Sequence, residues 1–143
     1  TSLELDPAEM EKRNIHLQQK YAEIEEKEVR YEEIHCDDAE YLIVAFGSCA
    51  RIAQKAMEEA RAEGIKVGLL RPITLWPFPS KAIAERSRQV KGILTVELNA
   101  GQMVEDVRLA VECKVPVEYF GRLGGIVPDP DEVVTALKEK IIK

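Results

Sequence analysis

The feature that most constrains this chain is an apolar run that is followed by a helical pattern and then by a second apolar run. Residues 41–46 (Tyr-Leu-Ile-Val-Ala-Phe) form a continuous apolar stretch, which is typical of a strand buried on both faces. Residues 52–60 place apolar side chains at helical spacing, and residues 67–70 form the second apolar stretch. This order predicts two parallel strands that are joined by a right-handed helical crossover.

The same alternation continues to the end of the chain. Further buried strands are predicted at 92–97 and 115–120, an edge strand at 30–35, and helices at 80–90, from Asn99 onward and from Asp129 onward. Strands that alternate with helices in this way predict an α/β fold with four parallel strands.

The first thirty residues have a different character. Asp6, Pro7 and Glu9 form a helix-start pattern, and the helix is predicted to run to about Arg30. Its apolar stripe contains Met10, Leu17, Tyr21 and Ile24, and its other faces are almost wholly charged. We interpret residues 1–30 as a connecting helix that lies across the domain or leads from a preceding one. A solvated coiled-coil segment is the alternative, and residues 31–143 are the predicted α/β domain.

Composition excludes several classes of partner. The 143 residues carry a net charge of −6, which argues against nucleic acid or an anionic membrane surface. No stretch is long and apolar enough to predict a membrane span. The 3 cysteines form no closely spaced pair, which favours a reduced, cytoplasmic location. Packing is expected for all of them, although Cys49, at a predicted helix start, is the one whose thiol could be reactive.

Ligands of open α/β sheets bind beyond the carboxyl ends of the parallel strands. The loops predicted to meet there are 47–49, 71–79, 97–102 and 121–128. Gly47 gives the backbone freedom to turn, and the polar residues of these loops are Ser48, Arg71, Thr74, Glu97, Asn99, Gln102 and Arg122. Ser48, Ser80 and Asn99 are predicted helix caps. The helix starts at Ser48 and Asn99 could also hold an anion.

Motifs for specific chemistry are absent from these loops. The chain has no G-x-G-x-x-G after its first buried strand, no phosphate-binding P-loop and no G-x-S-x-G nucleophile elbow. No cluster has metal-ligand spacing, and His16 and His35 are expected on the surface. Glu97 is the best single candidate for chemistry, but it could equally bond Asn99, Arg71 or a partner subunit. We therefore assign no catalytic, cofactor-binding or metal-binding residue.

Trp76 is the unusual residue of the proline-rich loop. It lies in the run Leu75-Trp76-Pro77-Phe78-Pro79. We expect it to fill a gap in the core, and the alternative is that it anchors an interface, where aromatic residues are enriched.

Several of these segments together resemble a known family. They are Val44-Ala45-Phe46-Gly47-Ser48, the helix that carries Ala56, Ala60 and Gly64, the run from Leu70 to Pro79, and Leu94-Thr95-Val96-Glu97-Leu98-Asn99 with Gly101-Gln102. This pattern resembles the C-terminal domain of transketolase-like thiamine diphosphate enzymes. It is most similar to the α subunit of 2-oxoacid:ferredoxin oxidoreductases, and the resemblance covers essentially the whole chain.

The resemblance implies a three-layer α/β/α sandwich with a mostly parallel five-stranded sheet that has one antiparallel edge strand. It also implies a complete enzyme that decarboxylates a 2-oxoacid on thiamine diphosphate, passes electrons through iron–sulfur clusters to ferredoxin, and transfers the acyl group to coenzyme A. The sequence does not identify the 2-oxoacid, for which 2-oxoglutarate is one candidate. The cofactor motifs of such an enzyme are absent from this chain, so we expect a fragment that binds none of them and serves architecture and assembly.

Two alternatives remain at this point. One is a free-standing module that binds an anion or a nucleotide through the turns at Gly47-Ser48 and at 99–102. The other is the α subunit of a branched-chain 2-oxoacid dehydrogenase that uses lipoamide, which the proline-rich loop fits less well. In the leading interpretation, Gly47, Ser48, Arg71, Trp76, Glu97, Asn99 and Gln102 are candidate loop or interface residues, and the partners are other domains and subunits of the same oxidoreductase.

Overall fold

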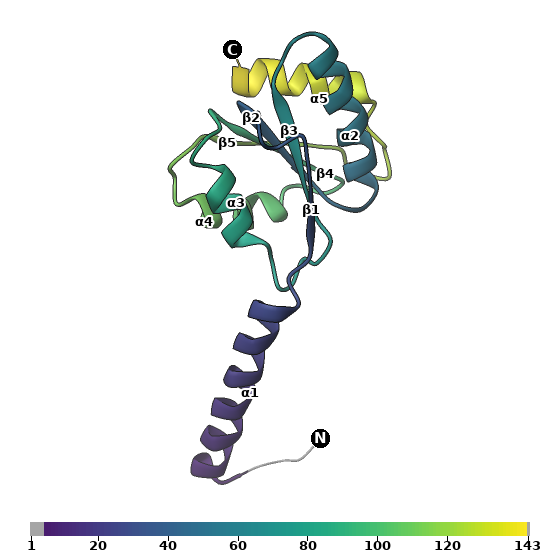
Figure 1. The fold of residues 1–143 in the computed structure, drawn as a ribbon. Helices are drawn as coiled ribbons and strands as arrows, with labels where there is room; N and C mark the ends of the chain where they lie inside the picture. Colours follow the sequence, from purple (N-terminus) through teal and green to yellow (C-terminus); the bar gives the residue numbers. More distant parts are fainter. Residues whose placement is uncertain (1–4, 143) are drawn as a thin grey trace.

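A central sheet with helices on both faces forms the body of the molecule (Figure 1). The computed structural model describes residues 5–142. The strands are β1 Tyr31–Ile34, β2 Tyr41–Ala45, β3 Val67–Pro72, β4 Ile93–Glu97 and β5 Val117–Gly121. The helices are α1 Pro7–Lys27, α2 Gly47–Ala62, α3 Ser80–Arg86, α4 Met103–Val111 and α5 Pro130–Leu137, and a π-helical segment, η1 Lys138–Ile142, continues α5.

The strand order across the sheet is β1-β3-β2-β4-β5. The edge strand β1 is antiparallel to β3, and the other neighbouring strands are parallel. Helices α2 and α5 cover one face and α3 and α4 cover the other, so the body has three layers (Figure 1). The predicted α/β/α sandwich with one antiparallel edge strand is confirmed.

The central strand β2 supplies both hydrophobic cores. Leu42 and Val44 pack with side chains of α3 and α4, whereas Ile43 and Ala45 pack with side chains of α2 and α5. None of these four residues is more than 1% exposed. Complete burial of one large aliphatic side chain contributes roughly 1.5–3 kcal/mol. Because both faces are covered, the strand has to be apolar at every position.

The helix starts at Ser48 and Ser80 differ from the prediction. Helix α2 begins at Gly47, whose φ of 56° lets the chain turn directly out of β2. The cap positions of α2 and α3 are held by Phe46 and Pro79, and neither serine makes a capping hydrogen bond. Each serine lies inside the first helical turn, Ser80 one position and Ser48 two positions after the cap, so neither side chain is placed to accept from a free N–H group.

The predicted end of α2 at Gly64 is confirmed. Gly64 has a φ of 88°, and its nitrogen donates to the carbonyl of Arg61 at 2.9 Å. The nitrogen of Ile65 donates to the carbonyl of Ala60 at 3.0 Å. These two bonds form a Schellman motif, which satisfies the last carbonyls of the helix and directs the chain into β3.

Helix α3 ends at Arg86, earlier than the predicted end near Val90. The hydroxyl of Ser87 donates to the carbonyl of Ala84 at 2.8 Å and competes with the backbone for that acceptor. The nitrogens of Arg88 and Gln89 then bond to carbonyls three residues back, which tightens the chain into turns before β4.

Helix α1 extends away from the sheet, and along most of its length no other described element packs against it (Figure 1). Asp6 caps it as predicted, because its Oδ1 accepts from the nitrogen of Ala8 at 2.8 Å. The helix ends at Lys27 rather than near Arg30, because the carbonyl of Arg30 accepts from the nitrogens of Ile73 and Thr74 beside the sheet. The helix therefore leads away from the domain and does not lie across it. No helix in the described range combines the length and apolar composition needed to cross a membrane.

Candidate functional site at the carboxyl edge of the sheet

Glu97 is the most constrained polar residue at the carboxyl edge. It is the last residue of β4 and is fully buried. Its Oε2 accepts from the nitrogens of Met103 at 2.8 Å and Gln102 at 3.2 Å, and its Oε1 accepts from the nitrogen of Val104 at 3.0 Å. The carboxylate therefore caps α4, where a negative charge also interacts favourably with the helix dipole. Its oxygens are directed at the backbone and not at a ligand site.

Asn99 is not the cap of α4, contrary to the prediction. Its Oδ1 accepts from the nitrogen of Gly101 at 2.7 Å and closes a small turn before the helix begins. The backbone oxygen of Asn99 accepts from the hydroxyl of Tyr119 in β5. Gln102 holds the cap position without a side-chain capping bond. The local prediction failed because Glu97, from the end of the preceding strand, reaches the free N–H groups first.

Cys49 lies in the first turn of α2, and the residue is only 3% exposed. Burial, and then the negative charge of Glu97, raise the pKa of the Cys49 thiol above its ordinary value. The thiol is therefore held in its neutral form, which is the opposite of what a nucleophilic role requires. Burial and the charge of Glu97 likewise raise the pKa of Tyr119. Sequence reasoning missed Tyr119, although its place in the strand beside β4 was a signal that it could meet this loop.

The two arginines of this edge form ion pairs within the domain. Arg71 lies opposite Glu32 in the β1–β3 ladder and donates to it at 3.1 Å. Arg122 donates to Glu132, whose other oxygen accepts from the nitrogen of Asp129 in the capping box of α5. Both arginines thus fasten neighbouring elements, although the Nε of each is buried without a partner among the described residues.

The loop after β3 is held by Thr74. Its Oγ1 accepts from the nitrogen of Arg30 at 2.9 Å and donates to the carbonyl of Pro77 at 2.8 Å. Trp76 is 56% exposed, so the prediction that it fills the core is wrong. Its ring instead meets the ring of Tyr21 edge to face, with centroids 5.7 Å apart. The indole thus links the loop to α1, while Pro77, the next residue, is buried.

Gly47 and Ser48 are exposed at the start of α2. The side chain of Ser48 has no hydrogen bond among the described residues. His16 and His35 are exposed, as predicted. No group of three or more His, Cys, Asp or Glu residues in the described range is placed to hold a metal ion. The edge therefore offers no assembled acid, base or metal centre within residues 5–142.

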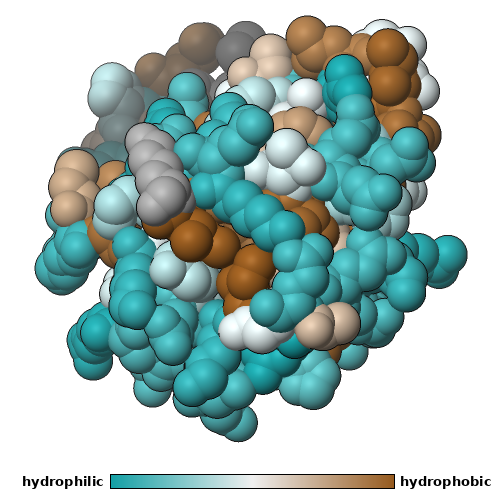
Figure 2. Space-filling view, turned by 90° about the horizontal axis from the view of Figure 1, so that it is seen from above, coloured by the Kyte–Doolittle hydropathy of each residue, from teal (hydrophilic) through white to brown (hydrophobic). Residues whose placement is uncertain are grey.

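The loops of this edge do present exposed apolar side chains. They follow β3, β4 and β5 and comprise Ile73, Leu75, Trp76, Leu98, Leu123, Ile126 and Val127. We call this set the edge patch. At the end opposite α1, hydrophilic side chains dominate and apolar ones form smaller areas between them (Figure 2). Apolar side chains gathered on one edge are typical of a protein–protein contact.

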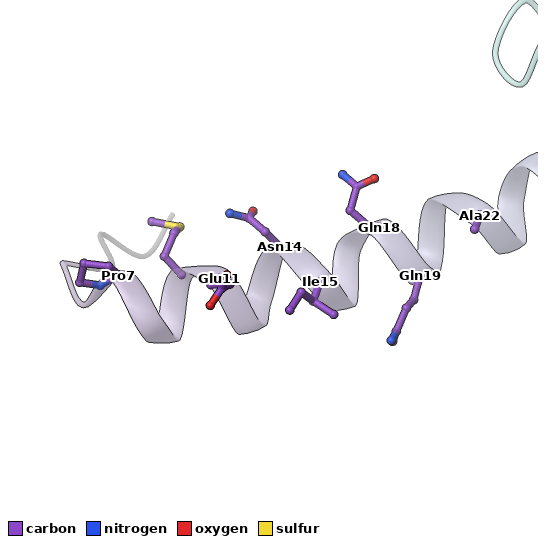
Figure 3. A pocket seen from close by; sticks show the side chains of 8 residues that line it. Pro7, Glu11, Asn14, Ile15, Gln18, Gln19 and Ala22 are labelled. Atoms are coloured by element: carbon purple, nitrogen blue, oxygen red, sulfur yellow. The ribbon is translucent and has the colours of Figure 1, made fainter.

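A hollow along α1 is lined only by side chains of that helix (Figure 3). It runs from Pro7 to Ala22, and no other element of the described residues forms a second wall. A small-molecule site needs a concave surface that covers most of its ligand, so this hollow does not define one.

The three-layer body with its antiparallel edge strand defines the class first. It is an α/β domain of the transketolase type, and a split-gene transketolase has the same fold, with a TM-score of 0.67 at 22% identity over 77% of this chain and 40% of that chain. The sequence profile of the pyruvate:ferredoxin oxidoreductase core domain II matches residues 39–133. The chain belongs to this family of 2-oxoacid:ferredoxin oxidoreductase domains.

Individual relatives agree with this assignment. The ketoisovalerate oxidoreductase subunit VorB of Methanothermobacter thermautotrophicus is 50% identical over 97% of this chain. The 2-oxoglutarate synthase subunit KorA of Methanothermobacter marburgensis is 33% identical over 71% of this chain and 27% of the subunit. A 2-oxoglutarate:ferredoxin oxidoreductase structure from Magnetococcus marinus has a TM-score of 0.82 at 25% identity over 96% of this chain and 24% of that chain. The chain spans 39% of the length of VorB.

Proposed function

We propose that this chain is the C-terminal architectural and assembly domain of the α subunit of a thiamine-diphosphate-dependent 2-oxoacid:ferredoxin oxidoreductase. The observation that carries the proposal is that polar side chains of the carboxyl edge bond within the domain while its apolar side chains are exposed. Glu97, Arg71 and Arg122 bond within the domain, whereas the edge patch is exposed. An edge of this kind supports contacts with other domains and subunits better than it supports chemistry. In this proposal residues 1–30 are the connecting helix and residues 31–143 the domain.

The complete enzyme would oxidise a 2-oxoacid to an acyl-coenzyme A in the cytoplasm and pass the electrons to ferredoxin. Thiamine diphosphate, iron–sulfur clusters and coenzyme A would be held by its other parts, because the donor groups described in this chain do not fit an iron–sulfur cluster. Cys36 and Cys49 are buried in different cores, and Cys113 is exposed. The higher identity to VorB than to KorA favours a branched-chain 2-oxoacid over 2-oxoglutarate as the first substrate to test.

The experiment is assembly of the complete enzyme with a disrupted edge patch. Leu98→Glu combined with Ile126→Glu should weaken association with the other subunits at least about tenfold, because buried aliphatic contacts are replaced by charges. Leu109→Glu is the matched control, since Leu109 is 79% exposed on α4 outside the patch. Size-exclusion chromatography of the co-expressed subunits measures assembly, and 2-oxoacid-dependent dye reduction identifies the substrate. Unchanged assembly of the double variant would refute the proposal.

The alternative, a free-standing anion-binding module, is supported at only one of its two predicted binding turns. The backbone N–H groups at the start of α4 donate to Glu97, so they are not available to an anion. Only the start of α2, at Gly47 and Ser48, remains exposed.

A further inference from the structure

A groove separates the end of α1 from the proline-rich loop and the start of α3. Its volume is about 690 Å³, and it is open to solvent along one side. Its apolar lining includes Val29, Tyr31, Trp76 and Phe78. We call α1 together with residues 28–30 the arm. Because these side chains come from the base of the arm, from β1 and from the proline-rich loop, the groove has walls on more than one element. We call it the arm groove.

The walls of the arm groove are fixed to one another. Ile73 and Thr74 donate their backbone N–H groups to the carbonyl of Arg30, and the hydroxyl of Thr74 accepts from the nitrogen of Arg30. The ring contact between Tyr21 and Trp76 joins the walls a second time. The groove is therefore preformed, which reduces the ordering that an occupant would have to impose.

Acidic side chains outnumber basic ones in the lining of the groove. Glu25 and Glu26 line the α1 wall, and neither has an ion-pair or hydrogen-bond partner among residues 5–142. The nearby cations are already paired: Lys27 lies 3.5 Å from Glu23, and Arg30 lies 3.4 Å from Glu28. Lys81 is the only cation that the described residues contribute to the groove lining. Two carboxylates against one ammonium leave the lining with a net negative charge beside an apolar floor.

We propose that the arm groove binds a segment of a partner protein that carries an apolar side chain next to a lysine or arginine. The apolar side chain would pack on Val29, Phe78 and Trp76, and the cation would lie between Glu25 and Glu26. A basic group would also interact favourably with the exposed indole face. The open side suits a chain that continues past the groove at both ends. This site is separate from the edge patch except at Trp76, so it stands whether or not the assembly function is correct.

The sole tryptophan of the chain reports on this groove directly, because it is Trp76. The probe is a capped peptide of alternating lysine and leucine, added to the full chain while the emission of Trp76 is recorded. One control peptide has glutamate in place of lysine, and a second has serine in place of leucine. We expect a saturable change with the lysine–leucine peptide and at least about tenfold weaker binding of both controls.

Variants then locate the binding. Glu25→Gln with Glu26→Gln should weaken the lysine–leucine peptide about fivefold, the effect expected from losing two exposed ion pairs. Glu11→Gln with Glu105→Gln removes the same charge away from the groove and should leave the affinity unchanged. Circular dichroism checks that each variant is folded.

Three results would overturn the inference. The first is no saturable change in Trp76 emission with the lysine–leucine peptide. The second is equal binding of the glutamate–leucine peptide or of the Glu25/Glu26 variant. The third is a concentration-dependent dimer that the groove variant abolishes, because the occupant would then be a second copy of this chain.

Discussion

The Oε2 of Glu97 lies 2.8 Å from the backbone nitrogen of Met103, so a carboxylate at the end of β4 forms the start of α4. Because the side chain is fully buried, its replacement leaves three backbone N–H groups without this acceptor. A buried polar group without a partner costs about 1–3 kcal/mol.

We therefore expect Glu97→Ala to lower the free energy of unfolding by about 3–5 kcal/mol, the combined effect of lost hydrogen bonds and a cavity. Urea denaturation followed by circular dichroism measures it. Glu105→Gln, an exposed change in the first turn of the same helix, should cost less than about 1 kcal/mol. Similar midpoints for the two variants would show that Glu97 is not the effective cap.

Cys36 should make stability depend on alkaline pH. Burial, assisted by the charge of Glu33, raises the pKa of the Cys36 thiol from 9.0 to about 11. Between these values the unfolded chain loses the proton while the folded chain keeps it, so the thiolate favours unfolding. The stabilisation is complete below pH 9 and is lost as the pH rises toward 11.

The measurement compares urea midpoints of the wild type and Cys36→Ala from pH 7 to pH 11. We expect the wild type to lose more stability than the variant above pH 9, because the alanine cannot ionise. Cys113→Ala, at an exposed position, is the matched control and should follow the wild type. Parallel curves for all three proteins would contradict the assignment.

Thr74 should control the connection between the arm and the sheet. Thr74→Val keeps the shape of the side chain but removes the acceptor for the Arg30 nitrogen and the donor to Pro77. We expect a loss of roughly 1–2 kcal/mol in the free energy of unfolding. Faster amide hydrogen exchange at Arg30 should accompany it. Thr135→Val, an exposed change on α5, is the control and should alter neither quantity.

Replacing Trp76 should affect the orientation of the arm more than the thermal stability of the domain. Because the side chain is 56% exposed, Trp76→Ala should shift the unfolding temperature of the domain by only about 2–3 °C. The edge-to-face contact with Tyr21 contributes about 0.5–1.5 kcal/mol, so its loss should increase the angular spread of α1. Spin labels on α1 and α5 measure that spread by electron–electron distance distributions. A large loss in the free energy of unfolding with an unchanged α1–α5 distance distribution would show that Trp76 contributes to the core after all.

The sequence predicted the elements whose causes are local. The apolar run in β2 and the edge position of β1 follow from burial and alternation, and Asp6 and Asp129 cap the helices that directly follow them. The prediction failed where the geometry of a side chain, rather than residue spacing, selects the partner. Glu97 replaces Asn99 as the cap of α4, and Tyr21 holds Trp76 outside the core. Glu97 is only two residues from Asn99, but residue spacing does not show that its side chain turns toward the nitrogens of residues 102–104. Tyr21, which contacts Trp76, lies far from it in the chain.

For the candidate site, the positions of the loops were predictable but their roles were not. The alternating pattern predicts parallel strands whose carboxyl ends share one edge, so the loops that carry Ser48, Glu97 and Arg122 were expected there. Whether a polar side chain faces solvent or bonds the backbone depends on a few ångströms of tertiary geometry, which residue spacing does not encode.

The projecting helix also acts as a lever. Its 21 residues span about 31 Å, so a rotation of about 10° at its base would displace the Asp6 end by roughly 5 Å. The bonds between Arg30 and Thr74 and the ring contact of Trp76 resist that rotation. A disturbance of less than an ångström at this joint would therefore be amplified several-fold at the tip, and the loop after β3 sets the direction in which the arm points.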